Sequence, residues 1–236
     1  MATGLALFDF DGTLIPWDTQ VIFANHVLKK APMRRAYLAC FAALSPAASV
    51  LGDEGMKRVF LSYLWKSDPR QISDWVRGFV DEWIPARCYS GVVEKLESHR
   101  AAGHLTVLAS ASPEFYVAEV GRALGFDLAF GTPVELADPM PLFPDLTNHK
   151  GREKVRRLSE ILGPPVDGLW PGSHGYTDST ADLPMMEACV SGTVVNPSPR
   201  LTRIAETNDW EILRPEVPWS GRIDKTLRIL RFAAGI

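Results

Sequence analysis

Two aspartates one residue apart, Asp9 and Asp11, end an apolar run at residues 5–8, and Gly12 follows them directly. The run predicts a buried parallel strand, and Gly12 predicts the turn that leaves it. Because side chains alternate along a strand, both carboxylates are expected to point the same way at its carboxyl end, where open α/β sheets bind ligands. Carboxylates this close repel each other unless a positive charge lies between them. The segment therefore predicts a site for Mg²⁺, a hard cation that suits oxygen ligands and a phosphate substrate.

A second group of polar residues follows a strand expected at 105–109. Ser110, Ala111 and Ser112 end this strand, and a helix is expected over 113–124. Ser112 is the predicted N-cap of that helix. Where a strand feeds a helix N-terminus, free backbone N–H groups and the helix dipole attract anions, and Ser110 adds a hydroxyl donor. Capping alone is the alternative interpretation of these hydroxyl groups.

A lysine and a second pair of aspartates complete the set. Lys150 and Lys154 precede or open a helix expected over 152–162, and an ammonium group near the site would neutralise phosphate charge. Asp178 and Asp182 lie four residues apart across a turn that enters a helix, a spacing that can place both on one face. A third carboxylate would complete an oxygen-rich Mg²⁺ shell, and the fourth would orient the lysine.

The elements that must position these residues follow from the pattern of the rest of the chain. Strands and helices alternate after residue 89, which predicts right-handed βαβ units and a parallel sheet. Between residues 16 and 87 helical periodicity dominates, which predicts a helical insertion after the first strand. The segment 170–177 is rich in Gly and Pro, so a short or distorted strand is expected before Asp178. The other expected elements are helices at 92–102 and from 183, strands at 128–131 and 192–196, and a loop or hairpin over 132–148.

The composition is that of a soluble globular protein, with 46% hydrophobic and 22% charged residues. A net charge of -3 implies no general affinity for nucleic acid. Cys40, Cys88 and Cys189 are odd in number and far apart, which predicts reduced core thiols in a cytoplasmic protein. Because no basic segment followed by an apolar core stands near residue 1, no secretory signal is expected.

An apolar stretch without charge covers residues 36–51, and Pro46 interrupts it. It is shorter than the roughly 20 residues of a membrane-spanning helix. One interpretation is a buried helical pair within a small helical domain. The other is an interfacial patch that contacts lipid, with basic residues at the headgroups. The basic residues just before the stretch are Lys29, Lys30, Arg34 and Arg35.

Taken together, the acidic and polar residues resemble the haloacid dehalogenase superfamily, and more narrowly its phosphoserine-phosphatase-like branch, subfamily IB. The segment 9–13, Asp-Phe-Asp-Gly-Thr, matches the first motif of that family, Ser110 the second, a lysine the third, and Asp178 with Asp182 the fourth. The resemblance covers nearly the whole chain. It implies an α/β fold, with a Rossmann-like parallel sheet core and a small helical (C1-type) cap domain. The implied core comprises residues 1–15 and 88–236, and the implied cap comprises 16–87.

The resemblance also implies the chemistry, which is Mg²⁺-dependent hydrolysis of a phosphate monoester. Asp9 would attack phosphorus and form an aspartyl-phosphate, while Asp11 would protonate the leaving oxygen and then activate water. The implied Mg²⁺ ligands are the Asp9 carboxylate, the Asp11 backbone carbonyl and Asp178.

The resemblance places further residues around the phosphate. Ser110 and a lysine would bind the transferring oxygens, and Asp182 would orient that lysine. Lys154 is the preferred lysine because this register keeps apolar residues on the inner face of its helix, and Lys150 is the alternative. The other residues expected to contact or support the phosphate are Gly12, Thr13, Ala111, Ser112 and Ser179.

The substrate is less restricted than the chemistry. Phosphoserine phosphatases place a glutamate nine residues after the nucleophile to hold a substrate amine; Asp18 stands there, so a small amino-alcohol phosphate is the first expectation. Arg58 is available to bind a substrate carboxylate or headgroup. The alternative substrate is a (lyso)phospholipid phosphate such as phosphatidylglycerophosphate, because members of the branch that act on such lipids also carry an apolar stretch in the cap. That alternative predicts peripheral membrane contact through the cap.

Two other functions are weighed against phosphatase activity. A catalytically silent binding module predicts the loss of an acidic motif residue, and none is lost. A phosphonate-cleaving enzyme needs a Schiff-base lysine in the cap; Lys57 and Lys66 are available, without a visible apolar setting that would lower a lysine pKa. His174 is expected to be structural. The expected partner is therefore a small phosphate ester, and the sequence leaves the oligomeric state open.

Overall fold

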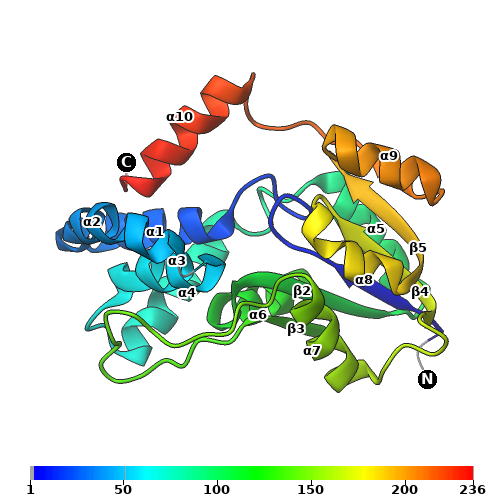
Figure 1. Ribbon diagram of the computed structural model, residues 1–236, viewed down its shortest axis with the longest axis horizontal. Coiled ribbons are helices and arrows are strands. Elements are labelled where there is room, and N and C mark those ends of the chain that lie inside the picture. Colours follow the sequence, from blue (N-terminus) through cyan, green and yellow to red (C-terminus); the bar gives the residue numbers. More distant parts are fainter. Residues whose placement is uncertain (1–2, 51, 236) are drawn as a thin grey trace.

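The fold is built on a six-stranded sheet with strand order β3-β2-β1-β4-β5-β6, in which every neighbouring pair is parallel. The computed structural model describes residues 3–50 and 52–235 and is shown in Figure 1; positions 1, 2, 51 and 236 of the expected domains lie outside the described residues. The strands are β1 Leu5–Phe8, β2 Leu105–Pro113, β3 Leu128–Thr132, β4 Trp170–Thr177, β5 Cys189–Val195 and β6 Glu211–Leu213. The predicted Rossmann-like α/β fold is confirmed.

Strand β1 lies in the middle of the sheet and is buried along its whole length. Leu7 pairs with Val107 of β2 on one side and with Gly175 of β4 on the other. Ala6 and Phe8 pack into one hydrophobic cluster, and Leu5 and Leu7 into a second. The alternation of side chains therefore gives β1 a hydrophobic contact on each face, as a central parallel strand requires.

Helices cover both faces of the sheet. Helices α5 Ser90–Ala101 and α6 Glu114–Leu124 contribute to the cluster that contains Phe8. Helices α7 Arg152–Leu162, α8 Leu183–Glu187 and α9 Pro199–Thr207 contribute to the cluster that contains Leu7. A short 3-10 turn, η3 Thr180–Asp182, leads from β4 into α8. The carboxyl ends of the strands remain open for a site.

A group of helices lies between β1 and α5 in the sequence and beside the sheet in space (Figure 1). Its members are α1 Thr19–Lys30, η1 Pro32–Ala36, α2 Tyr37–Val50, α3 Gly52–Phe60, η2 Leu61–Leu64 and α4 Pro69–Trp83. Helix α10, Arg222–Ala233, runs back from the far end of the chain to pack against α1.

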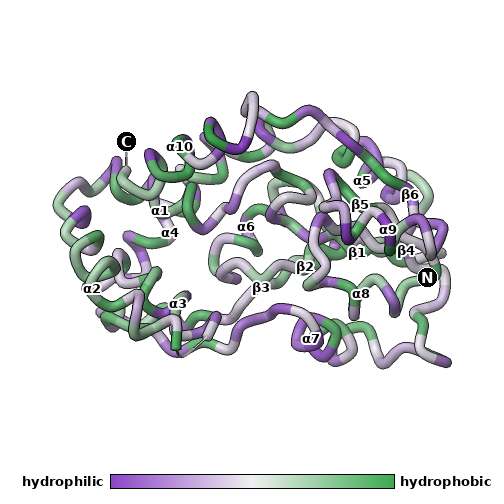
Figure 2. The backbone as a smooth tube through the Cα atoms, turned by 45° about the horizontal axis from the view of Figure 1, so that its top comes forward, coloured by the Kyte–Doolittle hydropathy of each residue, from purple (hydrophilic) through white to green (hydrophobic). Residues whose placement is uncertain are grey.

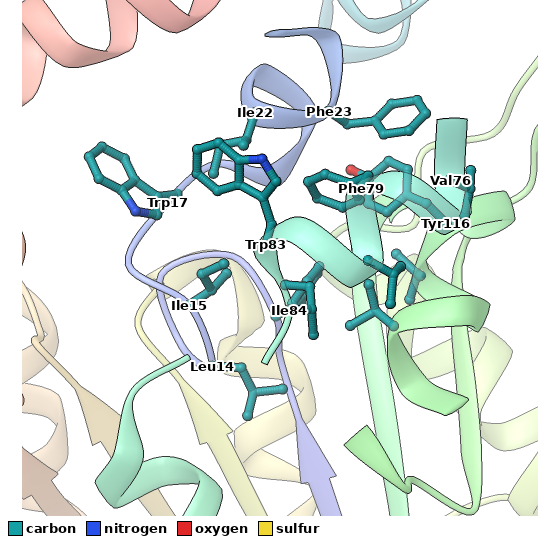
Figure 3. Packing of buried hydrophobic residues seen from close by; sticks show 14 of the residues in the cluster. Leu14, Ile15, Trp17, Ile22, Phe23, Val76, Phe79, Trp83, Ile84 and Tyr116 are labelled. Carbon is teal, nitrogen blue, oxygen red and sulfur yellow. The ribbon is translucent and has the colours of Figure 1, made fainter. Parts of the chain in front are cut away.

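Aromatic packing joins these helices to the sheet domain (Figure 3). The ring of Phe23 from α1 lies 5.3 Å from Phe79 of α4 and 5.1 Å from Tyr116 of α6, measured between centroids. All three side chains are fully buried. Full burial of each such ring contributes about 1.5–3 kcal/mol to stability, so the contact fixes the helical insertion over the carboxyl edge of the sheet.

Several local predictions are corrected by the structure. Strand β4 runs for eight residues, and its pairing with β5 shifts between Trp170 and His174, so of the short or distorted strand that was expected it is the distorted one. Strand β2 extends to Pro113, and α6 begins at Glu114 with no side-chain cap, so the N-cap prediction for Ser112 is wrong. The hydroxyl of Ser112 is instead used by the site. Strand β6 and helix α10 have no counterpart among the predicted elements.

Of the apolar stretch 36–51, the described residues 36–50 do not form the buried helical pair that was one expectation. Residues 37–50 form the single helix α2, which contains Pro46 and has only Tyr37 and Ala48 buried. Figure 2 colours most of α2 as hydrophobic. Within the described ranges, no helix combines the length and apolar character required to cross a bilayer. Of the three cysteines, all free, Cys189 alone is fully buried, so the core-thiol prediction holds for one of them.

Candidate active site

The site forms where the order of the strands reverses, between β1 and β4, which is the usual ligand position in such sheets. Asp9 follows β1 and Asp178 follows β4, and the Asp9 N–H donates to the Tyr176 carbonyl at 3.0 Å. This bond continues the β1–β4 pairing to the edge of the sheet. The parallel register thus brings two aspartates that are far apart in sequence to the same place.

Lys154, in the first turn of α7, lies between two carboxylates. Its Nζ atom is 2.9 Å from Asp9 Oδ1 and 2.8 Å from Asp182 Oδ1, and all three side chains are buried. Thr177 Oγ1 donates to the other Asp182 oxygen at 3.0 Å. Although burial lowers the pKa of Lys154, the carboxylates of Asp182 and Asp9 raise it above its ordinary value. Lys154 is therefore a fixed, fully protonated ammonium group beside Asp9.

The ammonium group of Lys154 does not fully compensate the negative charge of Asp9 and Asp178. Burial raises the pKa of Asp9 to about 7, and Lys154 offsets this only in part. Burial and the charge of Asp9 raise the pKa of Asp178 to about 8. Gly12 lets the Asp178 carboxylate lie against the turn after β1: the φ of Gly12 is +82°, and a Cβ there would lie 2.1 Å from Asp178 Oδ2. Any other residue at position 12 would collide with Asp178.

This crowding fits a divalent cation. Carboxylates with raised pKa values are those whose mutual repulsion a bound cation relieves. The described residues contain no cluster of three His, Cys, Asp or Glu side chains arranged for a metal. The expected ligand set, however, needs only the carboxylates of Asp9 and Asp178 with the backbone carbonyl of Asp11. Mg²⁺ is commonly bound through one or two carboxylates and retains several waters, so the residues present suit it.

Asp11 is held by donors from two other elements. Its Oδ1 accepts from the Thr19 N–H at 2.6 Å, and its Oδ2 accepts from Ser112 Oγ at 2.6 Å. Ser110 Oγ lies 3.4 Å from the same Oδ2 and accepts from the Ser112 N–H at 3.0 Å. Burial raises the pKa of Asp11, and these hydrogen bonds oppose the shift. The β2–α6 junction and the start of α1 therefore orient this carboxyl group together.

Two other lysines lie near the site in different settings. Lys150 pairs with Asp53 of α3 at 2.8 Å and is half exposed, so of the two candidate lysines only Lys154 contacts Asp9. Lys57 of α3 is buried and donates to the Ala111 carbonyl and to Asn148 Oδ1, each at 2.5 Å. Burial lowers the pKa of Lys57 to about 8. From the sequence, Lys57 was expected only as a lysine available to a phosphonate-cleaving enzyme, without an apolar setting that lowers its pKa. The structure corrects the second point, because Lys57 is buried beside the site.

Some of the residues expected to bind the substrate lie in the site, and others lie at the surface. Asp18 is the N-cap of α1 and accepts from the Gln20 N–H at 3.0 Å, yet it also lines the site. Arg58 pairs with Asp145 at 2.8 Å and lines neither cavity of the site, which does not support its expected contact with substrate. Thr13 donates to Asp9 Oδ2 at 3.0 Å, and Ser179 Oγ accepts from the Ala181 N–H at 3.2 Å.

Two adjoining cavities meet at Asp11, Asp18, Ala111 and Lys150. The first, of about 370 Å³, contains the catalytic candidates Asp9, Gly12, Lys154, Asp178, Ser179 and Asp182. The second, of about 390 Å³, extends between α1, α2 and α3 and is lined by Val21, Phe41, Met56, Lys57 and Phe60 among others. His174 lies outside both and bridges Ser191 and Thr193 at 2.7 Å each, in accord with a structural role.

Comparison with known proteins gives a consistent picture. The chain matches the haloacid dehalogenase-like hydrolase family over residues 6–187, more than half of its length. It is 25% identical to a probable phosphatase of Mycobacterium tuberculosis, with 92% of this chain and 77% of that protein covered. A protein of unknown function from Bordetella pertussis Tohama I superimposes with a TM-score of 0.76 at 26% identity, covering 90% of this chain and 99% of the other. A probable phosphoserine phosphatase from Vibrio cholerae shares the fold, with a TM-score of 0.63 at 17% identity, covering 98% and 64%.

Replacing Lys154 by Ala is expected to lower the free energy of unfolding by about 3–5 kcal/mol, because Asp9 and Asp182 would remain buried without their counter-ion. Urea denaturation measures the change. Lys150→Ala is the matched control: it removes a half-exposed ion pair, which contributes at most about 1 kcal/mol. Equal losses in the two variants would contradict the central position given to Lys154.

Proposed function

The chain is a phosphatase of the haloacid dehalogenase-like hydrolase family, and we propose that it hydrolyses phosphate monoesters with Mg²⁺ through an aspartyl-phosphate on Asp9. The observation that carries the proposal is the buried contact of Lys154 with both Asp9 and Asp182. It fixes a carboxylate and an ammonium group side by side at the carboxyl edge of the sheet. That pair supplies a nucleophile and a charge that neutralises the phosphoryl group.

Asp9 is suited to attack because both of its oxygens are oriented. Lys154 holds Oδ1 and Thr13 holds Oδ2, so little motion is left to the carboxylate. In the first step an Asp9 oxygen bonds to phosphorus while the ester oxygen departs, taking a proton from Asp11. In the second step a water molecule gives a proton to Asp11 and attacks phosphorus. The products are the alcohol and inorganic phosphate, and Asp9 is regenerated.

Asp11 is suited to move the proton. Burial raises its pKa, which favours a carboxyl group that carries a proton until the leaving oxygen needs it. Its bonds to Thr19 and Ser112 hold the group in place between α1 and the β2–α6 junction. Helix α1 begins the helical insertion, so the acid–base group is oriented in part by the proposed cap domain, residues 16–87.

The phosphoryl group would be held by charge and by hydrogen-bond donors. Ser110 and Lys154 lie beside Asp11 and Asp9 respectively and would donate to the transferring oxygens. Mg²⁺, bound by Asp9, Asp178 and the Asp11 carbonyl, would supply further positive charge for the phosphoryl oxygens. Asp182 fixes the position of Lys154.

The second cavity would receive the leaving group. Asp18 offers a carboxylate for a substrate amine, in agreement with a small amino-alcohol phosphate, while Lys57, which also lines the cavity, is bonded to the Ala111 carbonyl and to Asn148 Oδ1. The same cavity has an apolar wall formed by Phe41, Met56 and Phe60. A small metabolite with both charged and apolar parts suits this lining.

A phospholipid phosphate is the second candidate substrate, favoured by the surface of α2. This helix carries no charged residue and is largely exposed, and its Phe41 also lines the leaving-group cavity. An apolar surface helix that forms one wall of a site would let a lipid substrate enter from a bilayer. The basic residues Lys29 and Lys30 at the end of α1 would contact anionic headgroups.

Asp9→Asn is expected to reduce the turnover of para-nitrophenyl phosphate by on the order of 10³-fold or more, because the amide is not a nucleophile. Steady-state assays with Mg²⁺ measure this loss. Asp74→Asn is the control, since Asp74 lies exposed on α4 in a pair with Arg77, and its activity should stay unchanged. Activity in the Asp9 variant close to that of the natural chain would refute the nucleophile.

Removing divalent cations with EDTA is expected to abolish turnover, and Mg²⁺ should restore it. A ligand that binds only the folded state also raises the melting temperature. Mg²⁺ should therefore raise it in the natural chain and fail to do so in Asp178→Asn, which loses one of the proposed ligands. Turnover that persists in EDTA, or an identical thermal response in both proteins, would remove Mg²⁺ from the proposal.

If α2 contacts lipid, the protein should co-sediment with anionic phospholipid vesicles at low ionic strength. Leu44→Asp places a charge on the exposed face of α2 and is expected to weaken the binding. Val190→Asp is the control, because Val190 is exposed on β5, away from the helical insertion. No co-sedimentation of the natural chain at low salt would favour the small metabolite.

A further inference from the structure

Helix α10 lies beyond the segment that matches the family, which ends at residue 187, yet it is anchored over the helices beside the site (Figure 1). The Phe232 ring packs against Trp17 and Trp83, with centroids 5.1 Å and 5.5 Å apart. Asn25 Nδ2 of α1 donates to the Phe232 carbonyl at 3.0 Å. These contacts fix the carboxyl end of α10 on α1 and α4.

The amino end of α10 is fixed at the mouth of the catalytic cavity. Trp219, just before the helix, meets Trp17 edge to face with centroids 5.0 Å apart. Asp224 in the first turn accepts from the Ser220 N–H at 3.1 Å, which shapes the entry to the helix. Lys225 Nζ lies 4.5 Å from the centroid of the Trp219 ring. An aromatic ring attracts an ammonium group in this position and so restricts where its charge lies.

Lys225 lines the same cavity as Asp9, Asp178 and Lys154. Five carboxylates line this cavity, Asp9, Asp11, Asp18, Asp178 and Asp182, against three ammonium groups, Lys150, Lys154 and Lys225. A cavity with this excess of acid repels a phosphate dianion until cations compensate. Lysines that are not already held by carboxylates are therefore the ones available to the substrate.

The three ammonium groups differ in that respect. Lys154 is shared between Asp9 and Asp182, and Lys150 is paired with Asp53. For Lys225, the described part of the chain supplies no carboxylate within ion-pair distance, and its partner is the neutral ring of Trp219. No carboxylate holds its charge by direct contact, although its attraction to Asp18 opposes the rise that burial causes in the pKa of that carboxyl group. Its position is restricted by a ring that does not compete for hydrogen bonds.

We infer that Lys225 is a substrate-binding residue, whose ammonium group contacts the phosphate anion at the entrance of the catalytic cavity. This inference rests on the proposed phosphatase function and extends the active site to a helix outside the matched family segment. Because Lys225 touches none of the groups that exchange protons or form the covalent bond, its contribution belongs to binding. It should affect KM and leave kcat nearly unchanged.

The test compares Lys225→Ala with Arg231→Ala in steady-state assays with para-nitrophenyl phosphate and Mg²⁺. Arg231 is exposed in the last turn of α10 and lines neither cavity, so its removal changes the net charge equally without touching the entrance. Lys225→Ala should raise KM by about tenfold, Lys225→Arg should restore most of the affinity, and Arg231→Ala should have no effect. An unchanged KM in Lys225→Ala, or an equal rise in Arg231→Ala, would overturn the inference.

Binding of inorganic phosphate, followed by calorimetry with Mg²⁺ present, separates this inference from the proposed reaction. Weaker phosphate binding in Lys225→Ala supports the inference even if the natural chain hydrolyses no ester, an outcome that would refute only the phosphatase proposal. Equal phosphate affinity in the two proteins refutes the role of Lys225 whatever the turnover. If Lys225→Ala melts early, Lys225→Met retains an apolar stem over Trp219 and serves in the same measurements.

Discussion

The burial of one ammonium group between two carboxylates determines how the rest of this structure is arranged. Asp9, Lys154 and Asp182 come from β1, α7 and the turn before α8, and each is removed from water. A buried charge is strongly unfavourable without a partner, so none of these three elements can shift without exposing the other two to that cost. The parallel pairing of β1 with β4 and the packing of α7 on the sheet hold the three charges in register.

In the same arrangement the buried carboxylates of the site carry more negative charge than its lysine side chains compensate. One lysine serves two carboxylates, and burial raises the pKa of Asp9 and Asp178 to about 7 and 8. A phosphate dianion adds to the deficit. The proposed Mg²⁺, inside the cavity, and the ammonium group of Lys225, at its entrance, would both compensate the excess negative charge of the carboxylates and the phosphate.

The sequence predicted the parts of the site that depend on local geometry. Strand alternation and the turn at Gly12 were enough to place Asp9 and Asp11 at one edge of the sheet. The preference for Lys154 over Lys150 came from the family resemblance, whose motif register keeps apolar residues on the inner face of the helix. Lys57 and Arg58 are adjacent on α3, and packing decides which of them faces the cavity: Lys57 lines it, whereas Arg58 pairs with Asp145. Ser112 donates to Asp11 and does not cap α6, because a hydroxyl group serves either partner and tertiary contact decides between them.

The strand ends, the helical insertion and helix α10 contribute different parts of the site. The strand ends supply the groups that we propose make and break bonds, and their positions are fixed by the sheet. The cavity proposed for the leaving group is lined largely by the helical insertion, for example by Phe41 on α2 and Lys57 on α3. Lys225 of α10 lines the proposed entrance, and Trp219, just before that helix, restricts the position of its ammonium group. Phe232 of α10 packs on Trp17, just before α1, and on Trp83 of α4. A change in the packing of α10 would therefore alter both the entrance and the position of α1, whose Thr19 N–H donates to Asp11. The two aromatic contacts of Phe232 thus link the proposed entrance of the cavity to the helix that holds Asp11.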